Sequence, residues 1–265
     1  MKAPLLCLPL VLVLACGGTS GTSSDASAAG KTSTAVGAGS SGAGVGGATT
    51  AGNGSGAGSN LPGAIPIVPA MGGDVPYQLG TNTYGISGGA FLAKSPMGAT
   101  TVVLDDTQVG KICLKGTVEM VPTPADGSHP PYSQYWGIDL GFNLNQAADA
   151  TAGSEKTPWT VPPGVVGFWF TVEGAMIPQL RFKTTPTGKD PAQEQDSCAV
   201  VSPLNGVPNQ VLFKDMFVQC WDGPEGTGVT DISQGLLDVG LQVAADTNAA
   251  QPIDFCVTGF GVVEK

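Results

Sequence analysis

Polar and aromatic side chains alternate with apolar ones along several segments of the sequence, in a pattern that would gather them on one surface. The candidates for this surface are Trp169, Arg181, Asp139, Asn143 and Gln242, each at a polar position of its own segment. Aromatic rings stack on the C–H faces of sugars, and carboxylate, amide and guanidinium groups hydrogen-bond to sugar hydroxyls. The pattern therefore predicts a face that binds a polysaccharide or another glycan.

Further aromatic residues fall in segments that we expect to be loops or strand ends. They are Tyr132, Tyr135, Trp159 and Trp221. Of these we assign Tyr135 to the binding face. A competing interpretation is purely structural, with Trp136 and Trp221 in the core and Trp169 beneath the 145–164 loop.

Acidic residues are the second group that could take part in catalysis or binding. Asp139 and Glu173 both point away from the expected core, and a glycosidase needs two carboxyl groups about 5–10 Å apart across a cleft. Solvated polar positions on an outer face explain the same residues more simply. We therefore expect no glycosidase site.

Residues 85–89, Gly-Ile-Ser-Gly-Gly, match the G-x-S-x-G pattern of the α/β-hydrolase nucleophile. That chemistry also needs a strand–turn–helix context and a histidine base. The single histidine, His129, lies in a proline-rich segment, and no helix is predicted after Ser87. We interpret the match as accidental in a glycine-rich chain and expect no enzymatic activity.

Oxygen ligands that suit calcium are plentiful, although no D-x-D-x-D-G loop is present. A calcium site would therefore combine residues from separate strands and loops. Asp254 beside Asp105 or Asp106 is the candidate ligand set. A structural calcium ion is the one cofactor that the sequence leaves open.

The segment 135–145 is the most regular of the elements that must position these groups. Its apolar residues occupy every second position: Trp136, Ile138, Leu140, Phe142 and Leu144. Side chains alternate faces along a strand, so the segment predicts a long strand with one buried and one polar side. A helix would instead repeat its apolar residues at three and four.

The same period of two recurs along the rest of the chain. We expect strands at 85–92, 100–104, 111–121, 165–173, 178–183, 198–201, 211–213, 216–221, 236–244 and 253–263. Turns rich in glycine and proline separate these segments, and none of them predicts a helix. The expected fold class is all-β, an antiparallel β-sandwich of two stacked sheets.

Four cysteines fall among these strands: Cys113, Cys198, Cys220 and Cys256. An even number of cysteines in an exported chain indicates two disulfides, for which the sequence alone allows three pairings. Strand parity favours one of them, because Cys113 and Cys256 both take the non-core side of their strands. Cys198 would then pair with Cys220.

The folded domain is expected to occupy residues 62–265, because the composition changes before it. Residues 1–15 combine Lys2 with a short apolar run, which is typical of a secretory signal and too short to span a bilayer. Residues 16–61 are almost entirely Gly, Ser, Thr and Ala. Such a segment buries too little to offset the entropy of ordering, so we expect a disordered linker.

Residues 13–16, Val-Leu-Ala-Cys, resemble the bacterial lipoprotein signal, in which the cysteine becomes the lipidated first residue. The resemblance implies a lipid on Cys16. Gly17 follows the cysteine in place of an aspartate, which by the same resemblance favours the outer membrane. Leu14 is larger than the pattern prefers, so a secreted form without lipid is the alternative.

The formal net charge is −10. Nucleic acid and anionic lipid head groups are therefore poor partners. We expect the protein to contact a membrane through the lipid anchor only.

The strands together resemble the galactose-binding-like jelly rolls, which include many carbohydrate-binding modules of bacterial glycoside hydrolases. The likeness is carried by Trp-Gly-Ile-Asp-Leu at 136–140, Gly-Phe-Trp-Phe at 167–170, Leu-Arg-Phe at 180–182 and Ile-Asp-Phe-Cys-Val at 253–257, and it covers most of residues 80–265. It implies a jelly-roll fold, sugar binding on a concave sheet face and, in many members, a structural calcium ion. We expect no catalytic domain beside the module, which would be a departure from the usual arrangement.

The expected function is non-catalytic binding of a polysaccharide or glycan by a protein that is anchored to the bacterial outer membrane or secreted. The alternative is a structural or adhesive cell-envelope lipoprotein that contacts other proteins and binds no sugar. Exposed aromatic rings on a concave face favour the first function. A flat face rich in threonine and lysine favours the second.

Overall fold

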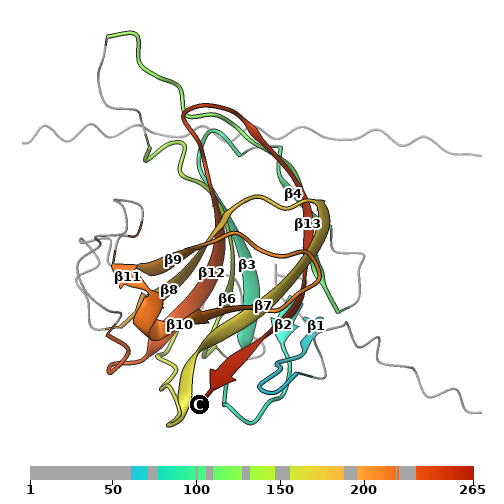
Figure 1. Cartoon of the computed structure of the whole chain (residues 1–265), viewed down its shortest axis with the longest axis vertical. Coiled ribbons are helices and arrows are strands. Elements are labelled where there is room, and N and C mark those ends of the chain that lie inside the picture. Colours follow the sequence, from blue (N-terminus) through green and yellow to red (C-terminus); the bar gives the residue numbers. More distant parts are fainter. Residues whose placement is uncertain are drawn as a thin grey trace, which may run out of the picture. The chain divides into compact units, whose positions relative to one another are not determined.

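The computed structural model consists of two antiparallel β-sheets, and in Figure 1 the strands of one sheet pass in front of those of the other. The structure describes residues 61–70, 77–99, 101–105, 110–126, 132–146, 156–187, 196–218, 220 and 231–265. None of these residues belongs to a helix that is long and apolar enough to cross a membrane. The predicted signal peptide, most of the predicted linker, Cys16, Asp106, His129 and Trp221 lie outside the described residues.

The larger sheet has eight strands in the order β1-β2-β3-β6-β12-β8-β9-β11. These are β1 (Ile67–Pro69), β2 (Tyr77–Leu79), β3 (Gly88–Lys94), β6 (Gly137–Asn143), β12 (Leu236–Ala244), β8 (Leu180–Pro186), β9 (Ser197–Val201) and β11 (Phe217–Val218). The smaller sheet has five strands in the order β10-β7-β13-β5-β4. These are β10 (Asn209–Leu212), β7 (Val165–Met176), β13 (Gln251–Glu264), β5 (Ile112–Val118) and β4 (Val103–Asp105). A 3₁₀ turn, η1 (Phe213–Asp215), follows β10.

The predicted fold class, an all-β antiparallel sandwich, is confirmed. The chain passes repeatedly from one sheet to the other, for example from β5 to β6, from β6 to β7 and from β7 to β8. Such crossings are typical of jelly rolls, in which strands adjacent in sequence pack face to face rather than side by side.

Strand β6 lies near the centre of the larger sheet, between β3 and β12. Its apolar residues Ile138, Leu140 and Phe142 are buried in the core, as the period of two predicted. The strand begins at Gly137 rather than at 135. A Cβ at Gly137 would lie 2.0 Å from the Val243 carbonyl oxygen, and its φ is 108°, so this close approach requires glycine.

Aromatic rings join the two sheets across the core. Phe168 of β7 packs against Phe182 of β8 with ring centroids 5.8 Å apart, and Phe142 of β6 stacks on Phe260 of β13 at 5.1 Å. All four side chains are at most 2% exposed. Each buried phenylalanine contributes about 1.5–3 kcal/mol of hydrophobic stabilisation, so these contacts hold the sheets in a fixed alignment.

Residues 61–65, which we call the docked segment, run along β13 ahead of the first strand. The Ile65 amide donates to the Phe260 carbonyl at 2.9 Å, and the Val262 amide donates to the Gly63 carbonyl at 3.0 Å. The sequence predicted neither this contact nor β1 and β2, because segments of three residues are too short to show a period.

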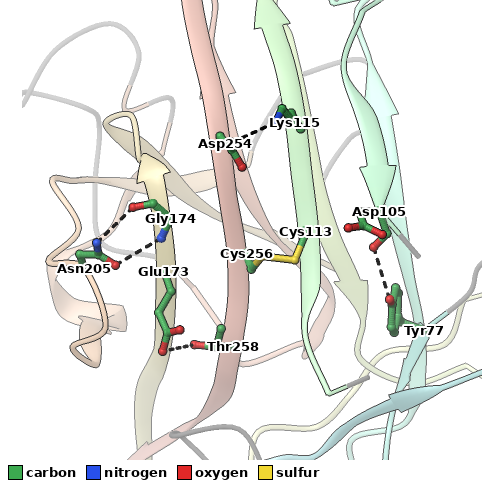
Figure 2. Close-up of a disulfide and its surroundings, with 10 residues drawn as sticks. All are labelled: Tyr77, Asp105, Cys113, Lys115, Glu173, Gly174, Asn205, Asp254, Cys256 and Thr258. Atoms are coloured by element: carbon green, nitrogen blue, oxygen red, sulfur yellow. Dashed lines mark hydrogen bonds and ion pairs between the residues drawn. A yellow bond between two sulfur atoms is a disulfide. The ribbon is translucent and has the colours of Figure 1, made fainter. Parts of the chain in front are cut away.

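Both predicted disulfides are confirmed. Cys113 of β5 is bonded to Cys256 of β13, and Cys198 of β9 is bonded to Cys220. Cys113 and Cys256 lie directly opposite each other in the strand register, on the outer side of the five-stranded sheet (Figure 2). Strand parity was thus a sufficient guide to the pairing.

Candidate functional site

Four of the predicted ligand residues lie on the outer side of the eight-stranded sheet. Asp139 and Asn143 come from β6, Gln242 from β12 and Arg181 from β8. In the register, Asp139 is opposite Gln242, and Gln242 is opposite Arg181 on its other side. Adjacent strands lie about 4.8 Å apart, so these three residues form a row across the sheet. We call the outward side chains of β3, β6, β12 and β8, with those that contact them, the polar face.

Ion pairs connect the strands of the polar face. Lys183 Nζ lies 3.4 Å from Asp139 Oδ2 and 2.8 Å from Asp196 Oδ2. A second pair joins Lys156 Nζ to Asp238 Oδ2 at 3.0 Å. The side chains of Lys183 and Asp139 are only 17% and 13% exposed, so water screens this pair much less than it screens a surface pair.

Two glycines allow side chains to lie flat across the sheet. Asp139 and Lys183 belong to strands separated by β12, where Gly240 is in register with Lys183. A Cβ at Gly240 would lie 2.2 Å from Asp139 Oδ1, which means that the carboxylate crosses β12 over this glycine. In the same way, a Cβ at Gly141 would lie 2.1 Å from the Phe91 ring.

Burial and ion pairing shift the pKa values of the central groups. Burial raises the pKa of Asp139, and the nearby charge of Lys183 offsets this only in part. Burial opposes the charge on Lys183 as well, but the carboxylates of Asp139 and Asp196 outweigh it and raise the pKa of the lysine. A raised pKa at Asp139 is compatible with a raised pKa at Lys183. The lysine has two carboxylate partners, and Asp196 is nearer to it than Asp139 is.

Three buried acceptor oxygens of the polar face have no hydrogen-bond partner among the described residues. They are Asp139 Oδ1, Asn143 Oδ1 and Gln242 Oε1. The amide nitrogens beside them are engaged, since Asn143 Nδ2 donates to Gln146 Oε1 at 2.8 Å and Gln242 Nε2 donates to the Trp136 carbonyl at 3.4 Å. A buried acceptor without a donor costs about 1–3 kcal/mol, so this face is suited to a ligand rich in donors.

The prediction that Trp169 shares this face is wrong. Trp169 lies on β7 of the other sheet and is 3% exposed. The docked segment covers it, and its Nε1 donates to the Pro62 carbonyl at 3.2 Å. The docked segment, and not the described part of the 145–164 loop, supplies this hydrogen bond. Parity tells which side of its strand a residue takes, but not which sheet the strand joins.

The other aromatic candidates differ in how far they are exposed to a ligand. Trp159 is a core residue, with its ring 5.8 Å from that of Phe168 and its Nε1 bonded to the Tyr84 carbonyl. Tyr135 is half-buried just before β6, and Tyr132 is exposed.

Phe91 of β3 is an aromatic ring of the polar face that sequence reasoning missed. It is half-buried over Gly141, and the Lys156 ammonium lies 5.0 Å from the ring centroid. Residues 89–93 are Gly-Ala-Phe-Leu-Ala. Without a polar residue in this stretch, no alternation could indicate which of its side chains face outward.

The two carboxyl groups that a glycosidase would need, Asp139 and Glu173, do not meet. Asp139 is on the eight-stranded sheet and Glu173 is on the five-stranded sheet, where its Oε1 accepts a hydrogen bond from Thr258. The two residues occupy opposite outer faces of the sandwich and cannot flank one cleft. Ser87 is no nucleophile elbow either, because strand β3 rather than a helix follows it and its Oγ donates to the Gln146 carbonyl.

The grouping of Asp254 with Asp105 as calcium ligands is also wrong. They lie on β13 and β4, with β5 between them, and Asp254 contacts Lys115 at 3.3 Å (Figure 2). Within the described ranges, no three histidine, cysteine or acidic residues are grouped closely enough to hold a metal ion. Asp106 lies outside these ranges, and calcium stays a prediction of the sequence.

Comparison with known proteins gives similarity at the level of structure. The sequence matches no protein-family model and no curated protein. The family 11 carbohydrate-binding module of a cellulosomal cellulase from Clostridium thermocellum is similar with a TM-score of 0.39 and 9% identity, over 67% of this chain and 88% of that chain. The family 11 module from Clostridium thermocellum in complex with a β-1,3-1,4-mixed-linked tetrasaccharide is also similar with a TM-score of 0.39 and 9% identity, over 77% and 98% of the two chains.

These modules belong to the class that the sequence resemblance indicated. Their identity and TM-score are too low to transfer a ligand or a binding residue to this chain. The chemistry of the polar face has to be argued from its own residues.

Proposed function

We propose that the polar face binds a polysaccharide or glycan and performs no catalysis. The observation that carries this proposal is the set of three buried, unpaired oxygens on Asp139, Asn143 and Gln242. Each of these oxygens is covered in the unbound conformation, so its side chain must turn outward before a ligand can reach it. Sugar hydroxyls are hydrogen-bond donors and then satisfy the oxygen without adding a charge. The free energy that the unpaired acceptors cost is then recovered on binding.

The spacing of these oxygens indicates a ligand of more than one sugar ring. Asp139 and Asn143 are four residues apart on β6, which corresponds to about 13 Å along a strand. A single pyranose ring does not reach across that distance. Phe91 on the neighbouring strand adds apolar surface beside these residues.

The arrangement of charges favours binding over hydrolysis. Asp139 and Asp196 both contact Lys183, whose ammonium group therefore lies between the two carboxylates. In a glycosidase, the scissile bond occupies the space between the two acids. The lysine takes that space here, so we interpret the three side chains as a structural ion cluster that shapes the face.

Binding can be tested with the purified protein against a panel of polysaccharides in native affinity gels, followed by calorimetry. We expect Gln242→Ala to weaken binding of the retained polymer about 5- to 100-fold, because one buried hydrogen bond is lost. Asp254→Asn, on the outer side of the other sheet, serves as the control and leaves the affinity unchanged. A polymer that binds both variants equally would show that this face is not the site.

We further propose that a lipid on Cys16 holds the protein at the outer membrane. The support is the sequence pattern at 13–16 and the glycine-rich segment that follows it. Mass spectrometry of the mature protein tests this, with diacylglycerol on Cys16 as the expected result. Cys16→Ser should release the protein from membranes, and an unmodified Cys16 in the mature chain would contradict the proposal.

A second candidate function, contact with another protein, is favoured by exposed apolar residues beside β9. Val200, Leu204 and Val207 are 51%, 64% and 44% exposed. Val200 lines a cleft of about 630 Å³ between β9 and β10. In this case we expect Leu204→Asp to abolish capture of the partner from cell envelopes, and no polysaccharide of the panel to bind.

A further inference from the structure

Arg181 is the cation of the polar face that makes no ion pair within the described residues. Lys156 and Lys183 both contact carboxylates, at distances from 2.8 to 3.4 Å. Arg181 lies in register with Gln242 on one side and with Val200 of β9 on the other. Neither neighbour neutralises a guanidinium group.

The environment of Arg181 makes this lack of a counterion costly. The residue is half-buried, and burial lowers the pKa of its guanidinium group. A guanidinium group is not deprotonated in proteins, so Arg181 remains charged. A charge that is partly removed from water without a partner is unfavourable. Arg181 is therefore suited to a counterion that comes from outside the chain.

Two acceptor oxygens belong to residues in the same row across the sheet as Arg181. Gln242 Oε1 and Asp139 Oδ1 are buried and unpaired among the described residues, and Gln242 is in register with both Asp139 and Arg181. A guanidinium group offers two parallel N–H donors that match a carboxylate. The two oxygens need donors instead. A ligand with a carboxylate next to hydroxyl groups meets both demands.

We infer that the glycan of the polar face contains uronic acids, on the premise that the proposed function holds. Arg181 binds the carboxylate of a uronic acid, and Gln242 and Asp139 accept hydrogen bonds from hydroxyl groups of the sugar. A uronic acid carries its carboxylate on C6 and keeps its ring hydroxyls as donors. A sulfate ester on a ring hydroxyl supplies the anion at the expense of one of these donors.

The net charge of −10 does not oppose this assignment at the site itself. The described charges of the polar face are Lys156, Arg181, Lys183, Asp139, Asp196 and Asp238. Three cations balance three carboxylates, so the ligand meets a locally neutral surface. Repulsion from more distant acidic residues is screened beyond about 10 Å at 0.1 M salt.

The test compares polygalacturonate with its methyl ester, which keeps the ring hydroxyls and loses the charge. We expect the protein to bind polygalacturonate and to bind the ester at least about ten-fold more weakly. Arg181→Gln should weaken binding of polygalacturonate about 10- to 100-fold without weakening that of the ester. Arg181→Lys, which keeps the charge but loses the planar fork, should give an intermediate loss. Lys115→Gln removes an exposed cation of the opposite face and should change nothing.

The outcomes separate this inference from the proposed function. The uronic acid assignment is overturned if a neutral β-glucan or the ester binds as tightly as polygalacturonate and Arg181→Gln does not affect that binding. Glycan binding itself would then stand. Tighter binding of dextran sulfate, lost in Arg181→Gln, overturns it in favour of sulfate esters. No binding of any polymer by protein with intact thermal unfolding overturns both. Unchanged thermal unfolding of the two Arg181 variants establishes that their losses do not come from misfolding.

Discussion

At the scale of single residues, the polar face depends on Gly240, because the lack of a side chain there leaves room for Asp139. Asp139 and Lys183 are two strands apart and meet only because Gly240 between them has no Cβ. The same position in a typical strand would carry a side chain and hold the two charges apart. Gly240 thereby determines where the carboxylate lies.

Gly240→Ala should therefore destabilise the protein by about 1–3 kcal/mol, the usual cost of overpacking. The cause is the 2.2 Å approach of the new Cβ to Asp139 Oδ1. A double-mutant cycle with Asp139→Ala isolates this cause, because the clash partner is then absent. Urea unfolding should show a smaller cost of Gly240→Ala in the Asp139→Ala background. An equal cost in both backgrounds would mean that the glycine is required for another reason.

The raised pKa of Asp139 predicts a pH dependence of stability. Burial raises the pKa of this carboxyl from its ordinary value of 3.8, so the folded protein holds the proton more tightly than the unfolded chain. The stability contributed by Asp139 is then present below pH 3.8 and is lost as the pH rises through the raised value. Asp139→Asn removes this titration.

The measurement is the free energy of unfolding of wild type and Asp139→Asn between about pH 4 and pH 7. We expect the wild type to lose stability relative to the variant as the pH rises. A change in the opposite direction would mean that Lys183 lowers the pKa of Asp139 more than burial raises it.

Strand parity gave most of what the sequence could reveal about these residues. It placed Asp139, Asn143, Arg181 and Gln242 on outward positions, and the structure brings them to one surface. The pairing of Asp139 with Lys183 was beyond the sequence, because it depends on the order β6-β12-β8 across the sheet. Long-range strand order is decided by packing of the whole core and leaves no local pattern.

At the scale of elements, the two disulfides stabilise the sandwich to different degrees. Cys113–Cys256 closes a separation of 143 residues, and Cys198–Cys220 closes one of 22. Loop-closure entropy gives about 5 kcal/mol for the first and about 3 kcal/mol for the second. We expect the paired replacement of Cys113 and Cys256 by alanine to lower the free energy of unfolding more than that of Cys198 and Cys220. Urea titrations that rank the variants in the reverse order would contradict the entropic account.

Long strands were predicted well and short ones were not. The segment 236–244 coincides with β12, and 165–173 lies within the longer β7. Regular alternation over many residues identifies such strands, whereas β1 and β2 are three residues long. Trp169 shows what strand patterns leave undetermined. The sequence identified β7 as a strand, but it did not indicate which of the two sheets contains β7.

At the scale of the whole molecule, the docked segment is where the N-terminal part of the chain meets the sandwich. Gly63 has a φ of 72°, and a Cβ there would lie 2.2 Å from the Val262 carbonyl oxygen. The segment also covers Trp169 through the Pro62 carbonyl. A load applied through the N-terminus would therefore act first on these contacts.

Gly63→Ala should release the docked segment and expose Trp169. Gly85→Ala is a matched control, since Gly85 has a φ of 67° and a Cβ there would meet no described atom within 4 Å. Each substitution destabilises the protein by roughly 1–2 kcal/mol, because alanine disfavours the left-handed backbone conformation. Only Gly63→Ala also produces a clash with a backbone atom. We expect acrylamide to quench tryptophan fluorescence more in Gly63→Ala than in Gly85→Ala. Equal quenching would show that the segment stays in place without glycine.

The most direct test of the glycan-binding face is a map of backbone amide shifts by NMR. The labelled protein is titrated with an oligosaccharide of the polymer that it retains most strongly. The account predicts shifts along β6, β12 and β8, centred on Asp139, Gln242 and Arg181, with β5 and β13 unchanged. Shifts confined to the outer side of the five-stranded sheet or to the cleft beside β9 would contradict it, as would the absence of any shift with every polymer of the panel.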